Sequence, residues 1–341
     1  MTAAGNSSGI WKSALLALLS VCVSVFIAEV LVRLFVPVRD VGPLFTVNDP
    51  VMGKRIKKSF YTVRVTPEFT MTFTSNSLGY RGPEPDSPPT DSVLFLGDSF
   101  TMGFGVSDGE EYPALIKTLF DRTFGRNAVS VVNTGMGNNG NGRWIKLLRA
   151  EAGKFKPRLV VLQVMANDYD DNVREAYFRI ADNGALDELP IQVDAMKELE
   201  PLLDAVPGLS SSHLYSLVRQ AIAGPHSAAP GGLAPGQAPS TTDGSDYAER
   251  LTERLLAEAV AICRGKGYPV FAILVGLQGE RLKRVQSLFQ VQNVPFFMAP
   301  DKTERPEFYF KVDGHWNAAG HAFVARGVFE QLLALNLIPA R

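Results

Sequence analysis

The sequence predicts an α/β protein, a three-layer α/β/α sandwich built on a parallel sheet and preceded by one transmembrane helix. Two observations predict the sandwich: short, continuously apolar runs recur along the chain, and amphipathic helical patterns separate them. Strands that are apolar on both faces belong in a parallel sheet that helices cover from both sides, with right-handed crossovers. A third observation, an apolar stretch near the N-terminus, predicts the transmembrane helix.

The composition fits one large folded domain. Of the 341 residues, 46% are hydrophobic, which is enough for a substantial core. A formal net charge of -1 gives no general attraction to polyanions, so no nucleic-acid partner is expected. Two cysteines are too few for a disulfide framework, and only four histidines have to be considered as catalytic bases or metal ligands.

The stretch from Ala14 to Val32 carries a single charged residue, Glu29, and is long enough to cross a membrane as a helix. Its many Leu, Ile, Val and Phe residues outweigh about +3 kcal/mol for one carboxyl group, which costs less near a helix end. A cleaved signal peptide is the alternative, but no small-residue cleavage site follows the stretch. We therefore predict a tail (1–13) and an uncleaved anchor (14–36), with Glu29 in water at the interface or against a helix partner.

Between the anchor and the sandwich we expect a β-containing segment, residues 37–90, called the lead-in below. Apolar and polar residues alternate from Thr62 to Thr74, which is the period of a half-buried strand. A proline-rich stretch from Gly82 to Thr90 interrupts this pattern. The α/β domain is then predicted to occupy residues 91–341.

The α/β domain contains five predicted strands and five predicted helices. The strands are Ser92–Leu96, Val129–Asn133, Leu159–Met165, Pro269–Val275 and Val294–Met298. The helices are Glu111–Phe124, Arg143–Phe155, Tyr247–Lys266, Gly279–Gln290 and Ala318–Leu335. An insertion at about 170–246 separates the third and fourth strands. Its Ala/Gly/Pro/Ser-rich part, 223–245, is predicted to be flexible, and its earlier part, with Tyr177, Phe178, His213 and Tyr215, is a candidate lid or rim.

Polar residues follow the predicted strands at their carboxyl ends, where open parallel sheets bind ligands. The first strand leads into Gly97-Asp98-Ser99. A serine in such a turn can act as an acyl-transfer nucleophile and offer its own backbone N–H to a substrate oxygen. Taken alone, this triplet is more often a capped turn.

Two further segments offer hydrogen-bond donors for an oxyanion. Asn133 to Gly140 follows the second strand, and its glycines, Gly137 among them, allow backbone N–H groups to approach an anion closely. Asn167 and Asp168 follow the third strand and place a carboxamide at the same edge. The alternative for this pair is a helix or turn cap.

Asp313 and His315 precede the last predicted helix. An imidazole can take the proton of a nucleophilic serine, and a carboxylate two residues away can fix the orientation of the ring. By itself this pattern is also compatible with a helix cap beside a packed histidine. The four segments together favour the catalytic interpretation.

These four segments, in this order, resemble the SGNH/GDSL hydrolase superfamily over roughly Ser92 to Leu335. The resemblance implies a flavodoxin-like SGNH fold. It implies a triad of Ser99, Asp313 and His315, and an oxyanion hole formed by Ser99, Gly137 and Asn167.

The sequence also departs from the common pattern of that superfamily. Either Gly137 or Asn138 aligns with the glycine of the second block, and Met165 stands where a glycine is frequent. The sequence Asp-x-His-Trp-Asn at 313–317 is similar to the alginate O-acetylation branch, which favours acetyl transfer to glycans.

The segment Asn76 to Gly82 resembles a recurrent feature of membrane-anchored bacterial members. This resemblance implies a bacterial inner-membrane protein whose catalytic domain faces the periplasm or exterior, although the basic residues after the anchor do not favour export. Arg81, within this segment, is expected to be a surface or structural arginine, with substrate binding as the alternative.

Three function classes follow from the sequence. The first is a membrane-anchored serine esterase acting on O-acylated glycans or lipid-like esters, with O-acetyl transfer to an extracellular polysaccharide as its variant, because both reactions use the same residues. The second is a catalytically silent glycan-binding or scaffold module. The third, a metal-dependent hydrolase using Asp313, His315 and His321, lacks a recognisable ligand cluster, so neither a metal nor a cofactor is predicted. The sequence does not determine the oligomeric state.

Overall fold

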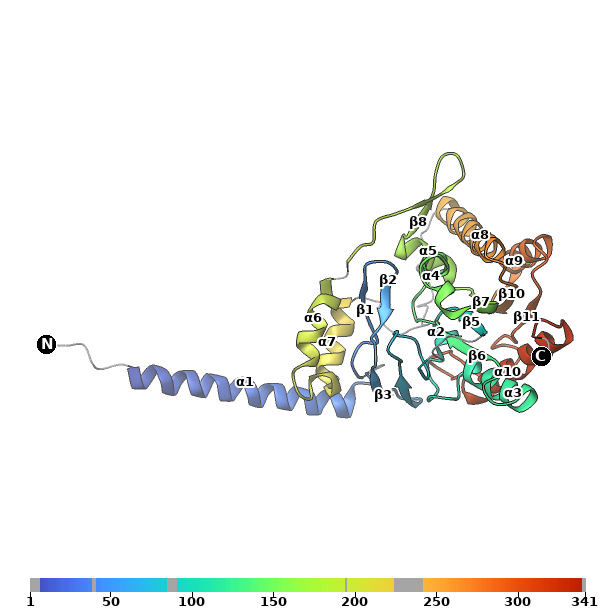
Figure 1. Cartoon of the computed structure of the whole chain (residues 1–341). Helices are drawn as coiled ribbons and strands as arrows, with labels where there is room; N and C mark the ends of the chain where they lie inside the picture. The colour runs from blue at the N-terminus through green and yellow to red at the C-terminus, as the bar shows by residue number, and fades with distance from the viewer. Residues whose placement is uncertain (1–6, 39–40, 85–90, 194, 224–241, 339–341) are drawn as a thin grey trace.

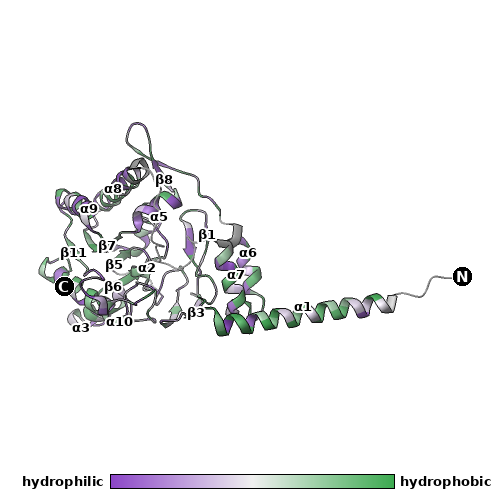
Figure 2. Ribbon diagram, turned by 180° about the vertical axis from the view of Figure 1, so that it is seen from behind, coloured by the Kyte–Doolittle hydropathy of each residue, from purple (hydrophilic) through white to green (hydrophobic). Residues whose placement is uncertain are grey.

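The computed structural model describes residues 7–38, 41–84, 91–193, 195–223 and 242–338. Figure 1 shows a long helix, α1 (Ser7–Phe35), which projects away from a folded body. Its residues Gly9–Phe35 are long and apolar enough to cross a membrane, and Figure 2 shows hydrophobic residues along its length. By length and composition, α1 fits a membrane span or a signal sequence.

The body is organised around a parallel five-stranded sheet in the order β11-β10-β7-β5-β6. In chain order its strands are β5 (Ser92–Leu96), β6 (Ser130–Asn133), β7 (Pro157–Met165), β10 (Val270–Val275) and β11 (Phe296–Met298). The first strand therefore lies between the second and the third, which is the flavodoxin-like order. All five predicted strands are confirmed, with ends shifted by two residues at most.

Each face of this sheet contributes to its own hydrophobic core. In β5, Leu94 and Leu96 lie in one core and Val93 and Phe95 in the other, as expected for alternating side chains. The first core is closed by α4 (Gly142–Ala150), α8 (Thr242–Gly265) and α9 (Gly279–Val291), and the second by α3 (Tyr112–Phe124) and α10 (Ala318–Ala334). Figure 1 shows the first set above the sheet and the second set below it. The predicted three-layer sandwich is confirmed.

Two predicted helix boundaries need correction. The helix predicted over Arg143–Phe155 is divided into α4 and a 3-10 turn, η1 (Ala152–Phe155). Gly153 lies within the second piece, and glycine disfavours a continuous α-helix by about 1 kcal/mol relative to alanine. At the other boundary, α8 begins at Thr242, so the end of the stretch predicted to be flexible is helical. Residues 224–241 of that stretch lie outside the described residues.

The lead-in forms two antiparallel hairpins. The first pairs β1 (Thr46–Asp49) with β2 (Gly53–Ile56), and the second pairs β3 (Tyr61–Val65) with β4 (Thr70–Thr74). The predicted alternation holds in β4, where Met71 and Phe73 are buried. These two residues pack with Met102, Phe104 and Met136 of the α/β domain, so the lead-in shares a core with that domain.

The insertion continues from α5 (Asp168–Glu175) into a short hairpin of β8 (Phe178–Ile180) and β9 (Leu186–Glu188). Next come α6 (Ala195–Asp204), a 3-10 turn, η2 (Leu209–Ser211), and α7 (His213–Ala223). Tyr177 and Phe178 are buried in the core that contains α4. The backbone N–H of His213 instead donates to Glu29 of α1, so α7 lies against α1 and does not form the lid considered from the sequence.

Candidate active site

Ser99 lies where β5 ends and a single helical turn, α2 (Ser99–Met102), begins. The Asp98 side chain caps this turn by accepting a hydrogen bond from Phe100 N at 2.9 Å. Gly97 permits the tight approach of neighbouring groups, because a Cβ there would lie 2.1 Å from Thr101 Oγ1 and 2.4 Å from Gln163 Oε1. The Gly-Asp-Ser sequence thus fixes Ser99 at the carboxyl end of an inner strand.

Ser99, His315 and Asp313 form a continuous chain of hydrogen bonds. His315 Nε2 lies 2.7 Å from Ser99 Oγ, and His315 Nδ1 lies 2.5 Å from Asp313 Oδ1. Ser99 and His315 are each 1% exposed. Gly314, between Asp313 and His315, has φ 87°, which glycine adopts readily and which lets the Asp313 side chain turn back onto the imidazole ring. The structure therefore brings together the three residues predicted as a triad.

The remaining residues of the Asp-x-His-Trp-Asn motif have structural contacts. Trp316 is fully buried, and its ring meets those of Phe100 and Tyr112. Asn317 caps α10 by accepting a hydrogen bond from Gly320 N at 3.1 Å. Trp316 in the second core and Asn317 at the start of α10 therefore fix the loop that carries His315.

The other two predicted site residues, Gly137 and Asn167, are partly buried in the loops after β6 and β7. Asn167 Nδ2 donates to Asp171 Oδ2 at 3.1 Å. Met136 N, next to Gly137, donates to Gly97 O at 3.2 Å, which joins the glycine-rich loop to the turn before Ser99. Within the described residues, neither Gly137 nor Asn167 is hydrogen-bonded directly to Ser99, so their oxyanion role stays a prediction.

Three buried carboxyl groups follow the strands at this edge: Asp98 caps α2, and Asp168 and Asp171 lie in the first turn of α5. Burial raises the pKa of Asp98 to about 6 and that of Asp171 to about 6. Burial, followed by the nearby charge of Asp98, raises the pKa of Asp168 well above its usual range. Asp168 accepts hydrogen bonds from Met165 N and Asn141 Nδ2, so this carboxyl closes the turn after β7.

Glu68, at the tip of the β3–β4 hairpin, contacts the loop that carries Asp313. Its carboxylate accepts hydrogen bonds from Val312 N at 3.0 Å and from Asp313 N at 2.6 Å. Phe69, the next residue, packs on Phe310 with ring centroids 4.7 Å apart. Sequence reasoning missed Glu68, because its local signal is only that of a polar residue near a turn.

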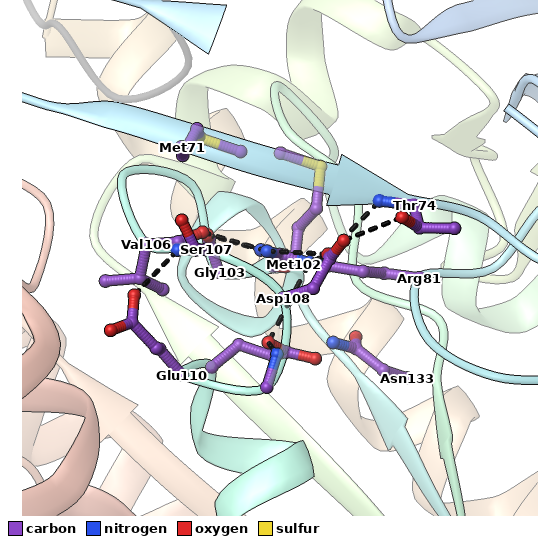
Figure 3. Close-up of polar contacts among 12 residues, drawn as sticks. Met71, Thr74, Arg81, Met102, Gly103, Val106, Ser107, Asp108, Glu110 and Asn133 are labelled. Atoms are coloured by element: carbon purple, nitrogen blue, oxygen red, sulfur yellow. Dashed lines mark hydrogen bonds and ion pairs between the residues drawn. The ribbon is translucent and has the colours of Figure 1, made fainter. Parts of the chain in front are cut away.

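Arg81 contacts the other half of the site and is fully buried. Its guanidinium donates to the carbonyl oxygens of Met102, Gly103 and Val106 at 2.6–2.9 Å, and to Asp108. Figure 3 shows this cluster, in which Asp108 also accepts from Thr74. Met102 and Gly103 end the turn that begins with Ser99, so Arg81 is the structural arginine considered from the sequence.

In the described parts of the chain, His, Cys, Asp and Glu side chains do not gather in groups of three that could hold a metal ion. The chemistry offered by the geometry is that of a serine whose proton can pass to a histidine held by a carboxylate. At the carboxyl edge of a flavodoxin-like sheet, this arrangement is typical of serine hydrolases.

Comparison with known protein families identifies the type of serine hydrolase. The sequence model of the GDSL-like lipase/acylhydrolase family matches residues 95–323, and the chain belongs to that family. It is accordingly a serine hydrolase of carboxylic esters. No curated protein matches the chain at a significant level.

Similar solved structures include a psychrotrophic esterase from a Pseudoalteromonas species, with 10% identity, a TM-score of 0.42, and 72% of this chain and 99% of that chain covered. Another is a catalytic mutant of an acetylxylan esterase from Geobacillus stearothermophilus, with 15% identity, a TM-score of 0.41, and 72% and 94% covered. A two-domain esterase active on acetylated mannans has 13% identity, a TM-score of 0.42, and 75% and 52% covered.

Proposed function

We propose that this chain is a membrane-anchored serine esterase that forms an acyl-enzyme on Ser99 and removes acyl groups from O-acylated glycans or lipid-like esters. The chain of hydrogen bonds from Ser99 through His315 to Asp313 is the observation that carries the proposal. Its two short distances allow proton transfer without rearrangement of the three side chains.

In the first half of the reaction, Ser99 Oγ attacks the ester carbonyl carbon while its proton passes to His315 Nε2. Asp313 accepts the hydrogen bond from His315 Nδ1 and stabilises the imidazolium that forms. The tetrahedral intermediate then collapses, the bond to the alkoxy group breaks, and the proton on Nε2 moves to the departing alcohol. The products of this half are an alcohol and an acyl ester of Ser99.

The negative charge on the carbonyl oxygen requires hydrogen-bond donors. Ser99 is the first residue of α2, so its backbone N–H has no acceptor within that helix. Asn167 Nδ2 carries two hydrogens, and its bond to Asp171 uses one of them, which leaves the second for a substrate. We assign the third donor to the backbone at Gly137.

In the second half, a water molecule loses a proton to His315 and attacks the acyl carbon, which releases a carboxylic acid and restores Ser99. A sugar hydroxyl in place of that water would give O-acetyl transfer with the same residues. The Asp-x-His-Trp-Asn sequence favours this variant by resemblance alone, because Trp316 and Asn317 make structural contacts. Hydrolysis is therefore the primary proposal.

The membrane part of the proposal depends on α1, whose exposed apolar side chains suit a lipid environment. We place the protein in a bacterial inner membrane, with the catalytic domain facing the periplasm. Protease treatment of spheroplasts tests this orientation: the body should be digested from outside, and its protection in intact spheroplasts would contradict the proposal.

The first test is hydrolysis of p-nitrophenyl acetate by the full-length protein in detergent. Ser99→Ala should abolish turnover, because the remaining groups cannot form the acyl-enzyme. Ser287→Ala, which removes an exposed hydroxyl from α9, is the matched control and should retain full activity. Full activity of the Ser99 variant would refute the triad assignment, and inactive wild-type protein would support the silent binding module.

A second assay separates hydrolysis from transfer. An acetylated oligosaccharide donor is incubated with and without an unacetylated oligosaccharide acceptor, and free acetate and newly acetylated sugar are both measured. Free acetate in proportion to donor consumed supports the esterase. Acetyl groups found mainly on the acceptor would make transfer the principal reaction.

A further inference from the structure

The helical pair α6–α7 (residues 195–223) has an unusual polarity. Glu200 and Asp204, one turn apart on α6, face the body, and their carboxylates lie 3.0 and 2.5 Å from Lys57 Nζ. Glu200 also accepts a hydrogen bond from Leu44 N and is 2% exposed. The acidic face of this helix is thus turned inward against the lead-in.

Three apolar side chains of α6 and of the residues just after it are exposed on the surface of the body. Leu199, Leu202 and Val206 are 50%, 70% and 49% exposed. Leu199 and Leu202, three residues apart, lie on one side of α6, and Val206 follows two residues after the helix ends; the three together are called the stripe below. A helix that faces water normally shows the reverse arrangement, with its apolar stripe toward the core. The stripe therefore fits an apolar environment outside the body.

The end of α1 is joined to the N-terminus of α7 by a compact set of polar contacts. Glu29 accepts hydrogen bonds from Ser212 Oγ at 2.7 Å, His213 N at 3.0 Å and Leu214 N at 2.9 Å. Arg33 pairs with Glu29 and donates to Ser211 O. The carboxylate thereby satisfies free N–H groups at a helix start, where negative charge is favourable.

The position of Glu29 along α1 sets the level of this junction. Residues 10–28 form a helix of about 28 Å at 1.5 Å per residue, which matches a hydrocarbon core of about 30 Å. Glu29 and Arg33 then lie where the helix leaves the hydrocarbon. Figures 1 and 2 both show α6 and α7 beside this end of α1, with α7 next to α1 and α6 farther from its axis.

We infer that α6–α7 is a second membrane contact, whose stripe of Leu199, Leu202 and Val206 lies in the boundary between lipid headgroups and acyl chains. The inference rests on the proposed membrane anchoring by α1. A bilayer is the occupant that the structure favours, because α6 and α7 lie beside the end of α1 at which that helix would leave the membrane. Attachment by two elements fixes the tilt of the catalytic body relative to the membrane.

The test uses the full-length protein in vesicles of phosphatidylcholine and phosphatidylglycerol, with a nitroxide label at one position in a Cys22→Ala background. Cys263 is buried and can remain. Labels are placed at Leu202→Cys, at Leu18→Cys in the middle of α1, and at the exposed Glu280→Cys on α9. Collision rates with molecular oxygen, which concentrates in lipid, and with a neutral nickel chelate, which stays in water, are measured for each label.

The Leu202 label should show a severalfold higher ratio of oxygen to nickel collisions than the Glu280 label, approaching the ratio at Leu18. A water-like ratio at Leu202 with a lipid-like ratio at Leu18 would overturn the second contact and leave the anchor intact. Water-like ratios at both positions would overturn the anchoring proposal as well. Protection from both reagents, with spectral broadening that dilution by unlabelled protein removes, would show a second copy on the stripe and overturn the lipid assignment.

Discussion

The α/β domain and the lead-in contribute to one site in different ways. The α/β domain supplies the reactive groups, since Ser99 follows β5 and His315 lies in the loop before α10. The lead-in supplies the contacts that hold their loops, through Glu68 on the Asp313 loop and Arg81 on the turn after Ser99. The family match at residues 95–323 excludes the lead-in.

The α/β domain thus provides the chemical groups, and the lead-in helps to position them. A parallel sheet places residues at one edge through its topology alone, but a triad requires its groups within a few tenths of an ångström of the productive geometry. In this chain the loops on both sides of that geometry are fixed by hydrogen bonds from a segment outside the sheet. Substitutions in the two regions should therefore have different types of effect, as well as effects of different size.

The largest expected effect is a loss of activity on substitution of a reactive group. His315→Gln should lower kcat/KM for p-nitrophenyl acetate by about 10⁴-fold or more, because no other group can take the Ser99 proton. His213→Gln, at the distant start of α7, is the matched control and should retain activity. A loss of less than tenfold in the His315 variant would show that the chemistry lies elsewhere.

The next effect is on stability and comes from the lead-in. Arg81→Lys should lower the free energy of unfolding by about 3 kcal/mol, because one ammonium cannot replace a buried guanidinium that serves several carbonyl groups and Asp108. Urea unfolding of the detergent-solubilised protein measures the loss. Arg264→Lys, at an exposed position on α8, should change stability little. Equal values for the two variants would refute the structural role of Arg81.

A smaller effect, on rate rather than stability, is expected at Glu68. Glu68→Ala removes the acceptor of Val312 N and Asp313 N, so the Asp313 loop should loosen and kcat fall by about 10–100-fold. Glu68→Gln, which keeps one acceptor oxygen, should fall less. Glu330→Ala on α10 is the exposed control. Unchanged kcat in Glu68→Ala would show that the sheet alone positions the triad.

The smallest expected effect concerns pH and His321 of α10. Burial, followed by the positive charge of Arg81, lowers the pKa of His321 to about 3 from 6.5. In the unfolded chain His321 therefore binds a proton below about pH 6.5, whereas in the folded protein it binds one only below about pH 3. The free energy of unfolding consequently falls as the pH falls through this range. Between pH 7 and pH 5 this loss is about 2 kcal/mol.

His321→Asn keeps an acceptor for Tyr112 N and removes the titration. The difference in unfolding free energy between pH 7 and pH 5 should then change by about 2 kcal/mol relative to the wild type. Asp98 and Asp171 titrate in the opposite sense, but they do so in both proteins and cancel in the comparison. An identical pH dependence in the two proteins would contradict a buried neutral histidine.

Local patterns in the sequence were sufficient to predict the sheet and the order of its chemical groups. The apolar runs are continuous because both faces of the sheet are covered, and the segments with Ser99, Asn167 and His315 stand where strands end or the last helix begins. Such signals depend on neighbours within a few residues. The proposed roles of Gly137 and Asn167 go beyond them and stay predictions.

Tertiary structure alone decided how these groups are held and which faces stay open. Glu68 and Asp313 lie 245 residues apart, and no periodicity relates them. Leu199 and Glu200 are adjacent in sequence, yet the carboxylate is buried against Lys57 and the leucine is half exposed. The amphipathic pattern of α6 defines two faces, and only its packing against the lead-in determines which face turns outward.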